Sequence, residues 1–245
     1  MADSGGFLPR HIAILACLLF GAVAACADPY PVESRLDVMH YRFAVTLHDD
    51  SDAIEVDATI DIALLDPDLR ELTLDLVGTD EPSDGKGMTL RRVAADGTPA
   101  AFTHRDNRVR VRLPQERADA GRVRLQLAYD GIPRTGLIIG PNKHGDRSFF
   151  SDNWPNKARH WLASVDHVAD KATSEMIVNA PSRLQVASNG ILVERTNLGS
   201  QRTLTHWRQG VPISPWLYVL AAAEFAVQRV DSFEGKAIET WVYWQ

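Results

Sequence analysis

Side chains that could ligate a metal or act as a nucleophile gather between residues 150 and 167. His160, Asp166 and His167 carry atoms that zinc accepts as ligands, but separations of six and seven residues match no familiar ligand spacing in a loop. Ser164 lies between these residues, yet no Gly-x-Ser-x-Gly turn is present to expose a serine nucleophile. We therefore expect a structural or interfacial role for this segment.

The amino terminus has the pattern of an export signal. Arg10 precedes an apolar run over residues 12–20, which is followed by small residues and is too short to span a bilayer comfortably. The pattern predicts a signal peptide over residues 1–27 and a linker over residues 28–34. The sequence therefore predicts an exported protein, in the periplasm or anchored at the outer membrane of a Gram-negative bacterium.

The end of the predicted leader has three interpretations. Val23-Ala24-Ala25-Cys26 resembles a bacterial lipobox, in which Cys26 would be acylated and become the new amino terminus. Ala25-Cys26-Ala27 also fits an ordinary signal-peptidase site. An uncleaved membrane anchor is a third reading. The first interpretation makes Cys26 the candidate lipidation residue and predicts a lipid anchor.

Composition excludes several classes of function. With 45% hydrophobic and 24% charged residues, the chain has the make-up of a globular protein. Its net charge of −6 disfavours a nucleic-acid partner, because phosphates require a basic face. Both cysteines, Cys17 and Cys26, lie in the predicted leader, so the mature domain has no cysteine for a metal site or a nucleophile.

The elements that position residues 150–167, here called the central segment, are predicted to be β-strands. Apolar and polar residues alternate over residues 41–47 and 54–64, as in strands with one buried face. Similar segments are 72–76, 109–113, 123–127, 176–178, 184–187, 191–193, 203–207 and 216–225. Many short strands predict an all-β domain over residues 35–245, a twisted antiparallel β-sandwich or saddle-like domain with little helix outside the leader.

Four motifs, in order and well spaced, carry a family resemblance. They are Tyr41-Arg42-Phe43-Ala44-Val45-Thr46-Leu47, Ala158-Arg159-His160-Trp161-Leu162-Ala163-Ser164-Val165-Asp166, Ala187-Ser188-Asn189-Gly190 and Ile213-Ser214-Pro215-Trp216-Leu217. Together they make residues 35–245 resemble the N-terminal β domain of the aminopeptidase N family, the gluzincin zinc aminopeptidases. This resemblance implies a protein that helps to remove N-terminal residues from peptides.

The same resemblance implies a substrate site. The family's Gln-x-Glu-Pro segment, which helps to bind the α-amino group of the substrate, falls on Asp152-Asn153-Trp154-Pro155. Asp152 can still accept hydrogen bonds from an ammonium group, and the ring face of Trp154 can contact a cation. Asp152 and Trp154 are therefore the substrate-binding candidates. A loop-capping role is the alternative for Asp152.

The family's catalytic machinery is expected to lie elsewhere. By the resemblance, a downstream domain holds zinc through a His-Glu-x-x-His helix, in which the zinc polarises the scissile carbonyl and the glutamate acts as general base. None of the eight histidines here forms that pattern. We therefore expect no catalytic residue and no metal or other cofactor in this chain, which would be inactive alone. Its partners would be a peptide amino terminus and a catalytic domain that is separate or missing.

A second class of function remains open. Tryptophans on a β domain can stack on sugars, so a stand-alone secreted module that binds carbohydrate or another surface is the alternative. Trp154 and Trp161 are the candidates, and a glycan-binding module would lose its ligand when either is changed. The more common role of scattered tryptophans is in a core or an interface.

Overall fold

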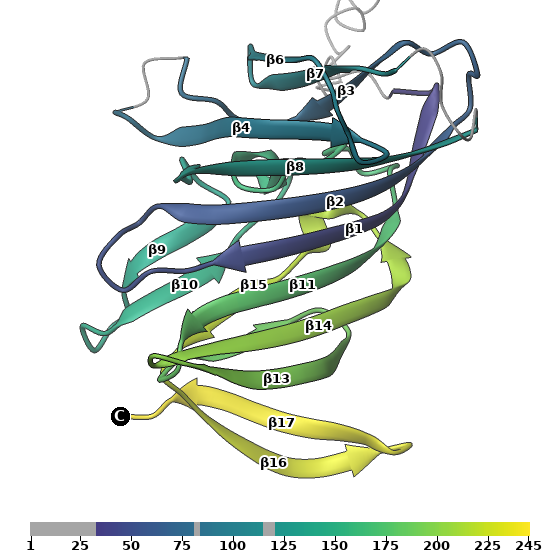
Figure 1. Ribbon diagram of the computed structural model, residues 1–245. Helices are drawn as coiled ribbons and strands as arrows, with labels where there is room; N and C mark the ends of the chain where they lie inside the picture. The colour runs from purple at the N-terminus through teal and green to yellow at the C-terminus, as the bar shows by residue number, and fades with distance from the viewer. Residues whose placement is uncertain (1–32, 81–83, 115–120) are drawn as a thin grey trace, which may run out of the picture. The chain divides into compact units, whose positions relative to one another are not determined.

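The computed structural model describes residues 33–80, 84–114 and 121–245. The predicted leader, Cys26 and most of the predicted linker lie outside the described residues. The described residues confirm the all-β prediction (Figure 1). Their helical content is two single 3-10 turns, η1 (Ala158–His160) and η2 (Pro215–Leu217), and none of the described helices has the length and apolar character to cross a membrane.

The largest sheet has eight strands in the order β13-β14-β11-β1-β2-β8-β4-β5 (Figure 1). Its strands are β1 (Leu36–Thr46), β2 (Ile54–Leu64), β4 (Gly87–Ala95), β5 (Thr98–Pro99), β8 (Arg122–Ile132), β11 (Ala172–Pro181), β13 (Ile191–Gly199) and β14 (Arg202–Ile213). Burial alternates along β1, β2 and β8, so one face of these strands is apolar. Its described pairs are antiparallel except β1 with β11, which run parallel.

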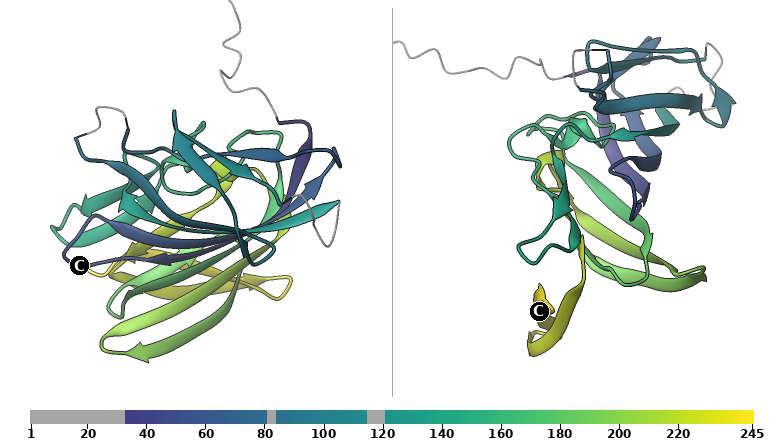
Figure 2. Two further views of the ribbon diagram at one scale, coloured as in Figure 1. Left: turned by 45° about the horizontal axis from the view of Figure 1, so that its top comes forward. Right: turned by 90° about the vertical axis from the view of Figure 1, so that its left-hand side faces the viewer.

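A four-stranded sheet forms a second layer, which the views of Figure 2 show beside the large sheet. Its order is β12-β15-β10-β9, with β9 (Leu137–Pro141), β10 (Arg147–Ser151), β12 (Gln185–Ser188) and β15 (Leu220–Ala223). A three-stranded sheet contains β3 (Glu71–Asp75), β7 (Arg108–Arg112) and β6 (Phe102–Arg105), and β16 (Phe225–Phe233) pairs with β17 (Lys236–Tyr243) as a hairpin.

One buried apolar cluster joins the three larger sheets. Tyr41 and Phe43 of β1 stack with ring centroids 5.5 Å apart, and Tyr218 meets them edge-on at 6.0 and 6.4 Å. Phe149 of β10 enters the same cluster. Full burial of such side chains stabilises the fold by about 1.5–3 kcal/mol each. This core therefore provides a firm base for the loop that follows β10.

Candidate functional site

The candidate substrate residue Asp152 lies just beyond the end of β10. Its backbone N–H donates to the carbonyl oxygen of Gly136 at 2.7 Å, which holds the start of the loop against the neighbouring chain. Its side chain is exposed, and Oδ2 lies 2.8 Å from Nζ of Lys157 in the same loop. The carboxylate is therefore accessible to a ligand and at the same time paired within its own loop.

The buried side chain of Asn153 anchors this loop. Its Nδ2 donates to the carbonyl oxygen of Tyr218 at 2.7 Å, and its Oδ1 accepts from Nε1 of Trp161 at 2.9 Å. Its carbonyl oxygen also accepts from the N–H of Lys157 at 2.8 Å. Sequence reasoning missed Asn153, although an amide that both donates and accepts suits such a buried anchor. Because Asn153 points inward, its two neighbours are presented outward.

Trp154 is 60% exposed, which is unusual for the largest side chain. Its ring meets that of Trp216 edge-on, with the centroids 4.9 Å apart, and the Trp154–Pro155 peptide bond is cis. Trp161, by contrast, is fully buried and uses its Nε1 on Asn153. The expectation that Trp161 could stack on a sugar is therefore wrong, because its ring belongs to the core. Trp154 keeps an accessible ring face.

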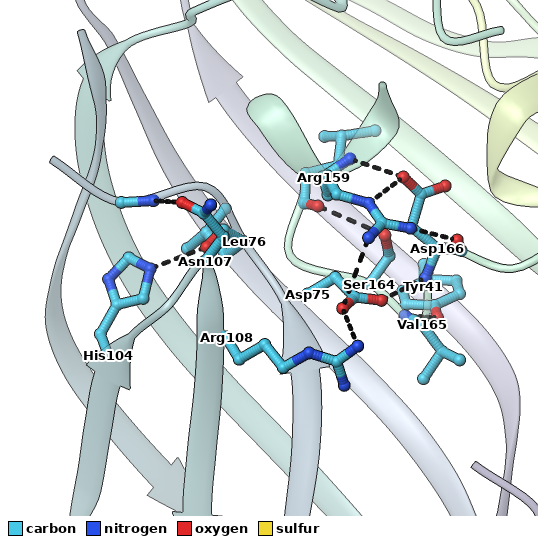
Figure 3. Close-up of polar contacts among 12 residues, drawn as sticks. Tyr41, Asp75, Leu76, His104, Asn107, Arg108, Arg159, Ser164, Val165 and Asp166 are labelled. Atoms are coloured by element: carbon cyan, nitrogen blue, oxygen red, sulfur yellow. Dashed lines mark hydrogen bonds and ion pairs between the residues drawn. The ribbon is translucent and has the colours of Figure 1, made fainter. Parts of the chain in front are cut away.

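A buried ionic network underlies the loop (Figure 3). Nε of Arg159 lies 2.9 Å from Oδ2 of Asp166, Nη2 donates to the carbonyl oxygen of Asp166 at 2.7 Å, and Nη1 lies 3.8 Å from Oδ1 of Asp75. Arg108 of β7 reaches the same oxygen of Asp75 at 3.7 Å. Burial raises the pKa of the Asp166 carboxyl even though the Arg159 guanidinium opposes this shift. Arg159 thus fixes the central segment to β3.

Two buried tyrosine hydroxyls hold the next turn. Tyr129 Oη accepts from the N–H of Ala163 at 3.0 Å, and Tyr41 Oη accepts from the N–H of Val165 at 2.9 Å. Tyr41 then donates to Oδ2 of Asp170 at 3.2 Å. The large sheet therefore sets the path of residues 161–166 through side chains that come from distant strands.

Asp170 should make stability depend on pH. Burial raises its pKa from 3.8 to about 6 in the fold, so the folded state holds this proton more tightly than the unfolded chain. Its contribution is complete below pH 3.8 and is lost as the pH rises through about 6, a change of about 3 kcal/mol. Asp170→Asn should remove this part of the pH dependence in urea unfolding measured from pH 4 to 8.

The exposed Asp68 provides the matched control for this measurement. Asp68→Asn should reproduce the pH profile of the unchanged protein. A constant difference in unfolding free energy between Asp170→Asn and the unchanged protein at every pH would contradict the assignment.

The metal candidates of the central segment do not fit zinc. Burial, together with the nearby positive charges of Arg134, Arg159 and Lys157, lowers the pKa of His160 to about 4. The carboxylate of Asp166 is committed to Arg159, and Nδ1 of His167 accepts from a nearby N–H. Across the three described stretches, no three His, Cys, Asp or Glu side chains are arranged to hold a metal ion. The segment is built from ion pairs and hydrogen bonds instead.

Comparisons with known proteins give a consistent picture. Residues 38–217 match the family model of the Peptidase M1 N-terminal domain. An M1 zinc metallopeptidase mutant from Deinococcus radiodurans, solved with a Tyr-Ser-Ala substrate, superposes with a TM-score of 0.72 at 21% identity. That match covers 86% of this chain and 48% of the other. Yeast LTA4 hydrolase in complex with bestatin gives a TM-score of 0.66 at 20% identity, over 91% of this chain and 34% of that one.

A further structural match agrees with these, and all of them extend beyond the length of this chain. A two-domain M1 zinc metallopeptidase mutant bound to L-tryptophan superposes with a TM-score of 0.72 at 21% identity, again over 86% of this chain and 48% of that one. This chain therefore spans about half the length of the metallopeptidases it resembles, or less. A search of curated proteins found no match. At such identities the solved structures establish the likeness of fold.

Proposed function

The chain belongs to the peptidase M1 family, the aminopeptidase N family of zinc metallopeptidases, through its N-terminal domain, and from this premise we propose that it positions peptides for an exported zinc aminopeptidase. In this proposal the domain holds the amino end of the peptide. Hydrolysis is the work of a zinc-binding domain that docks on it, in the same chain or in another. The chain of residues 1–245 is inactive alone.

The outer face of the four-stranded sheet carries this proposal. Along β10, Phe149 is buried in the core whereas Phe150 is 56% exposed, and Ile138 lies opposite Phe150 on the same face. The other neighbour of Phe150 is Ala221 of β15, which is buried, whereas Val219, two residues before Ala221, is exposed. A sheet face that met only water would be expected to carry polar residues here. Exposed apolar residues gathered on one face mark a surface that a protein partner covers.

The candidate binding residues lie at the end of this outer face. Asp152 directly follows Ser151, the last residue of β10, and its side chain is exposed, as is that of Trp154 on the loop. A ligand held here would lie at the edge of the docked domain. The Asp152 carboxylate accepts charge-assisted hydrogen bonds from the peptide ammonium group, and the Trp154 ring adds a cation–π contact.

The site should prefer a free amino group. Ala-Ala-Ala-amide should shift the amide NMR signals of residues 151–157 in the purified chain, and its N-acetyl form should not. Asp152→Asn should weaken binding about fivefold, because one charged acceptor is lost at an exposed site. Asp68→Asn, at a distant exposed position, should leave the affinity unchanged. Equal binding of the acetylated and free peptides would overturn the proposal.

Export and lipidation are part of the same proposal. The apolar run of residues 12–20 and the Val23-Ala24-Ala25-Cys26 block support secretion to the periplasm or the outer membrane, with Cys26 as the acylated residue. The mass of the mature amino terminus distinguishes acylated Cys26 from cleavage after Ala27. The proposal also predicts that the purified chain leaves aminoacyl-anilides intact and binds no stoichiometric zinc.

A further inference from the structure

The carboxylate of Asp152 already has a cationic partner. Nζ of Lys157 lies 2.8 Å from its Oδ2, and the two side chains are 33% and 49% exposed, respectively. This pair occupies the position at which the amino group of a peptide would bind in the function proposed above, and the inference drawn here rests on that function. A ligand's ammonium group therefore competes with the ammonium group of Lys157 for this carboxylate.

The backbone of Lys157 is held by hydrogen bonds, whereas its side chain is one-third exposed. Its N–H donates to the carbonyl oxygen of Asn153, and its own carbonyl oxygen accepts from the N–H of His160 at 3.1 Å. That carbonyl packs against Gly136, where an added Cβ would approach it to 2.2 Å. Only the flexible four-carbon stem of Lys157 can move its ammonium group. The group is thus tethered beside Asp152 and competes as an intramolecular ligand.

We propose that Lys157 is a selectivity residue that favours peptides with an acidic first residue. Such a peptide exchanges both partners of the ion pair, because its α-ammonium binds Asp152 while its side-chain carboxylate binds the released Lys157. A neutral first residue leaves Lys157 without a partner. A basic first residue brings a further positive charge next to it. Exposed ion pairs of this kind change an affinity by about two- to fivefold.

Two peptides of nearly equal shape test the proposal. Glu-Ala-Ala-amide and Gln-Ala-Ala-amide differ in one charge, and the amide at the carboxyl end removes the other carboxylate. NMR titration of the purified chain should show about two- to fivefold tighter binding of the Glu peptide. In Lys157→Met the Gln peptide should bind more tightly than in the unchanged protein. The Glu peptide should become the weaker ligand, because its carboxylate then faces Asp152 alone.

The controls separate this inference from the proposed function. Lys171→Met removes an exposed lysine elsewhere and should leave the Glu-to-Gln preference unchanged. A Glu peptide that binds no better than the Gln peptide, or a preference that survives Lys157→Met, overturns the role of Lys157. N-acetyl-Gln-Ala-Ala-amide tests the function beneath it. If this peptide binds as well as the free amine, or if no peptide binds, the ammonium site and the role of Lys157 are both overturned.

Discussion

Replacing Arg159 by methionine is expected to lower the free energy of unfolding by about 3–5 kcal/mol, because breaking a buried pair leaves an uncompensated charge. The side chain of Arg159 is 4% exposed, and its guanidinium lies beside both Asp166 and Asp75. Of the bonds that residue 159 makes to the Asp166 carboxylate, the one from its backbone N–H to Oδ2 would remain. Urea unfolding of the purified chain at pH 7 measures the loss.

An exposed ion pair provides the control for this substitution. Arg91 pairs with Asp130 through a short contact of 2.5 Å, but its side chain is 61% exposed. Arg91→Met should therefore cost less than about 1 kcal/mol, as surface pairs do. Similar losses for Arg91→Met and Arg159→Met would contradict the structural role of the buried network. Lowering the pH should reduce the loss in Arg159→Met, since the raised pKa of Asp166 lets this carboxyl neutralise early.

The alternation of apolar and polar residues predicted the strands that have one buried face and one exposed face. Residues 41–47 and 54–64 fall in β1 and β2, where burial alternates residue by residue. Strands β4 and β9 were not predicted, nor were β5, β6, β10, β16 and β17. β9 has the sequence Leu-Ile-Ile-Gly-Pro, in which no polar residues alternate with the apolar ones. The pairing register of β4 shifts between Leu90 and Arg92. A bulge of this kind breaks the period of two from which strands are read.

The prediction of one strand over residues 216–225 was wrong in extent. Pro215 begins the single turn η2, and β15 covers only Leu220–Ala223 before β16 starts at Phe225. Proline suits the first position of a helical turn, where its missing N–H has no partner to lose. The apolar composition of this segment reflects burial of β15, and a buried strand has no alternation to set its ends.

The candidate site was predictable only where its residues are close in sequence. Asp152 and Trp154 came from one four-residue segment, and the structure presents both outward. The network beneath them depends on distant partners, since the backbone N–H of Asp166 donates to Oδ2 of Asp75, which is 91 residues away in the sequence. No local pattern around Arg159 indicates which acids it will meet. The motif of the family resemblance contains both Arg159 and Asp166, whereas the fold shows that they pair and adds Asp75 as a second partner.

Replacing Trp161 by alanine is expected to destabilise the domain by about 3–5 kcal/mol, through the cavity it leaves. Trp161 is fully buried, and its loss also removes the donor that Oδ1 of Asn153 accepts from. Trp154→Ala is the matched control, because the same side chain is removed at 60% exposure. It should change the unfolding free energy by no more than about 1.5 kcal/mol, because it loses mainly its edge-on contact with Trp216. Equal losses in urea unfolding would contradict the assigned burial.

Because Trp154→Ala should fold normally, it also decides between the two functions considered for this surface. An exposed cation–π contact of about 0.5–1 kcal/mol predicts that this variant binds Ala-Ala-Ala-amide about two- to fivefold more weakly. If the surface is instead a platform for sugars, Trp154→Ala should lose glycan binding, and its affinity for the peptide should equal that of the unchanged protein. Loss of glycan binding in Trp161→Ala would carry no such meaning, since the change disrupts the core and the anchor of the loop together. Trp154 is therefore the position at which a loss of binding reports on the ligand rather than on the fold.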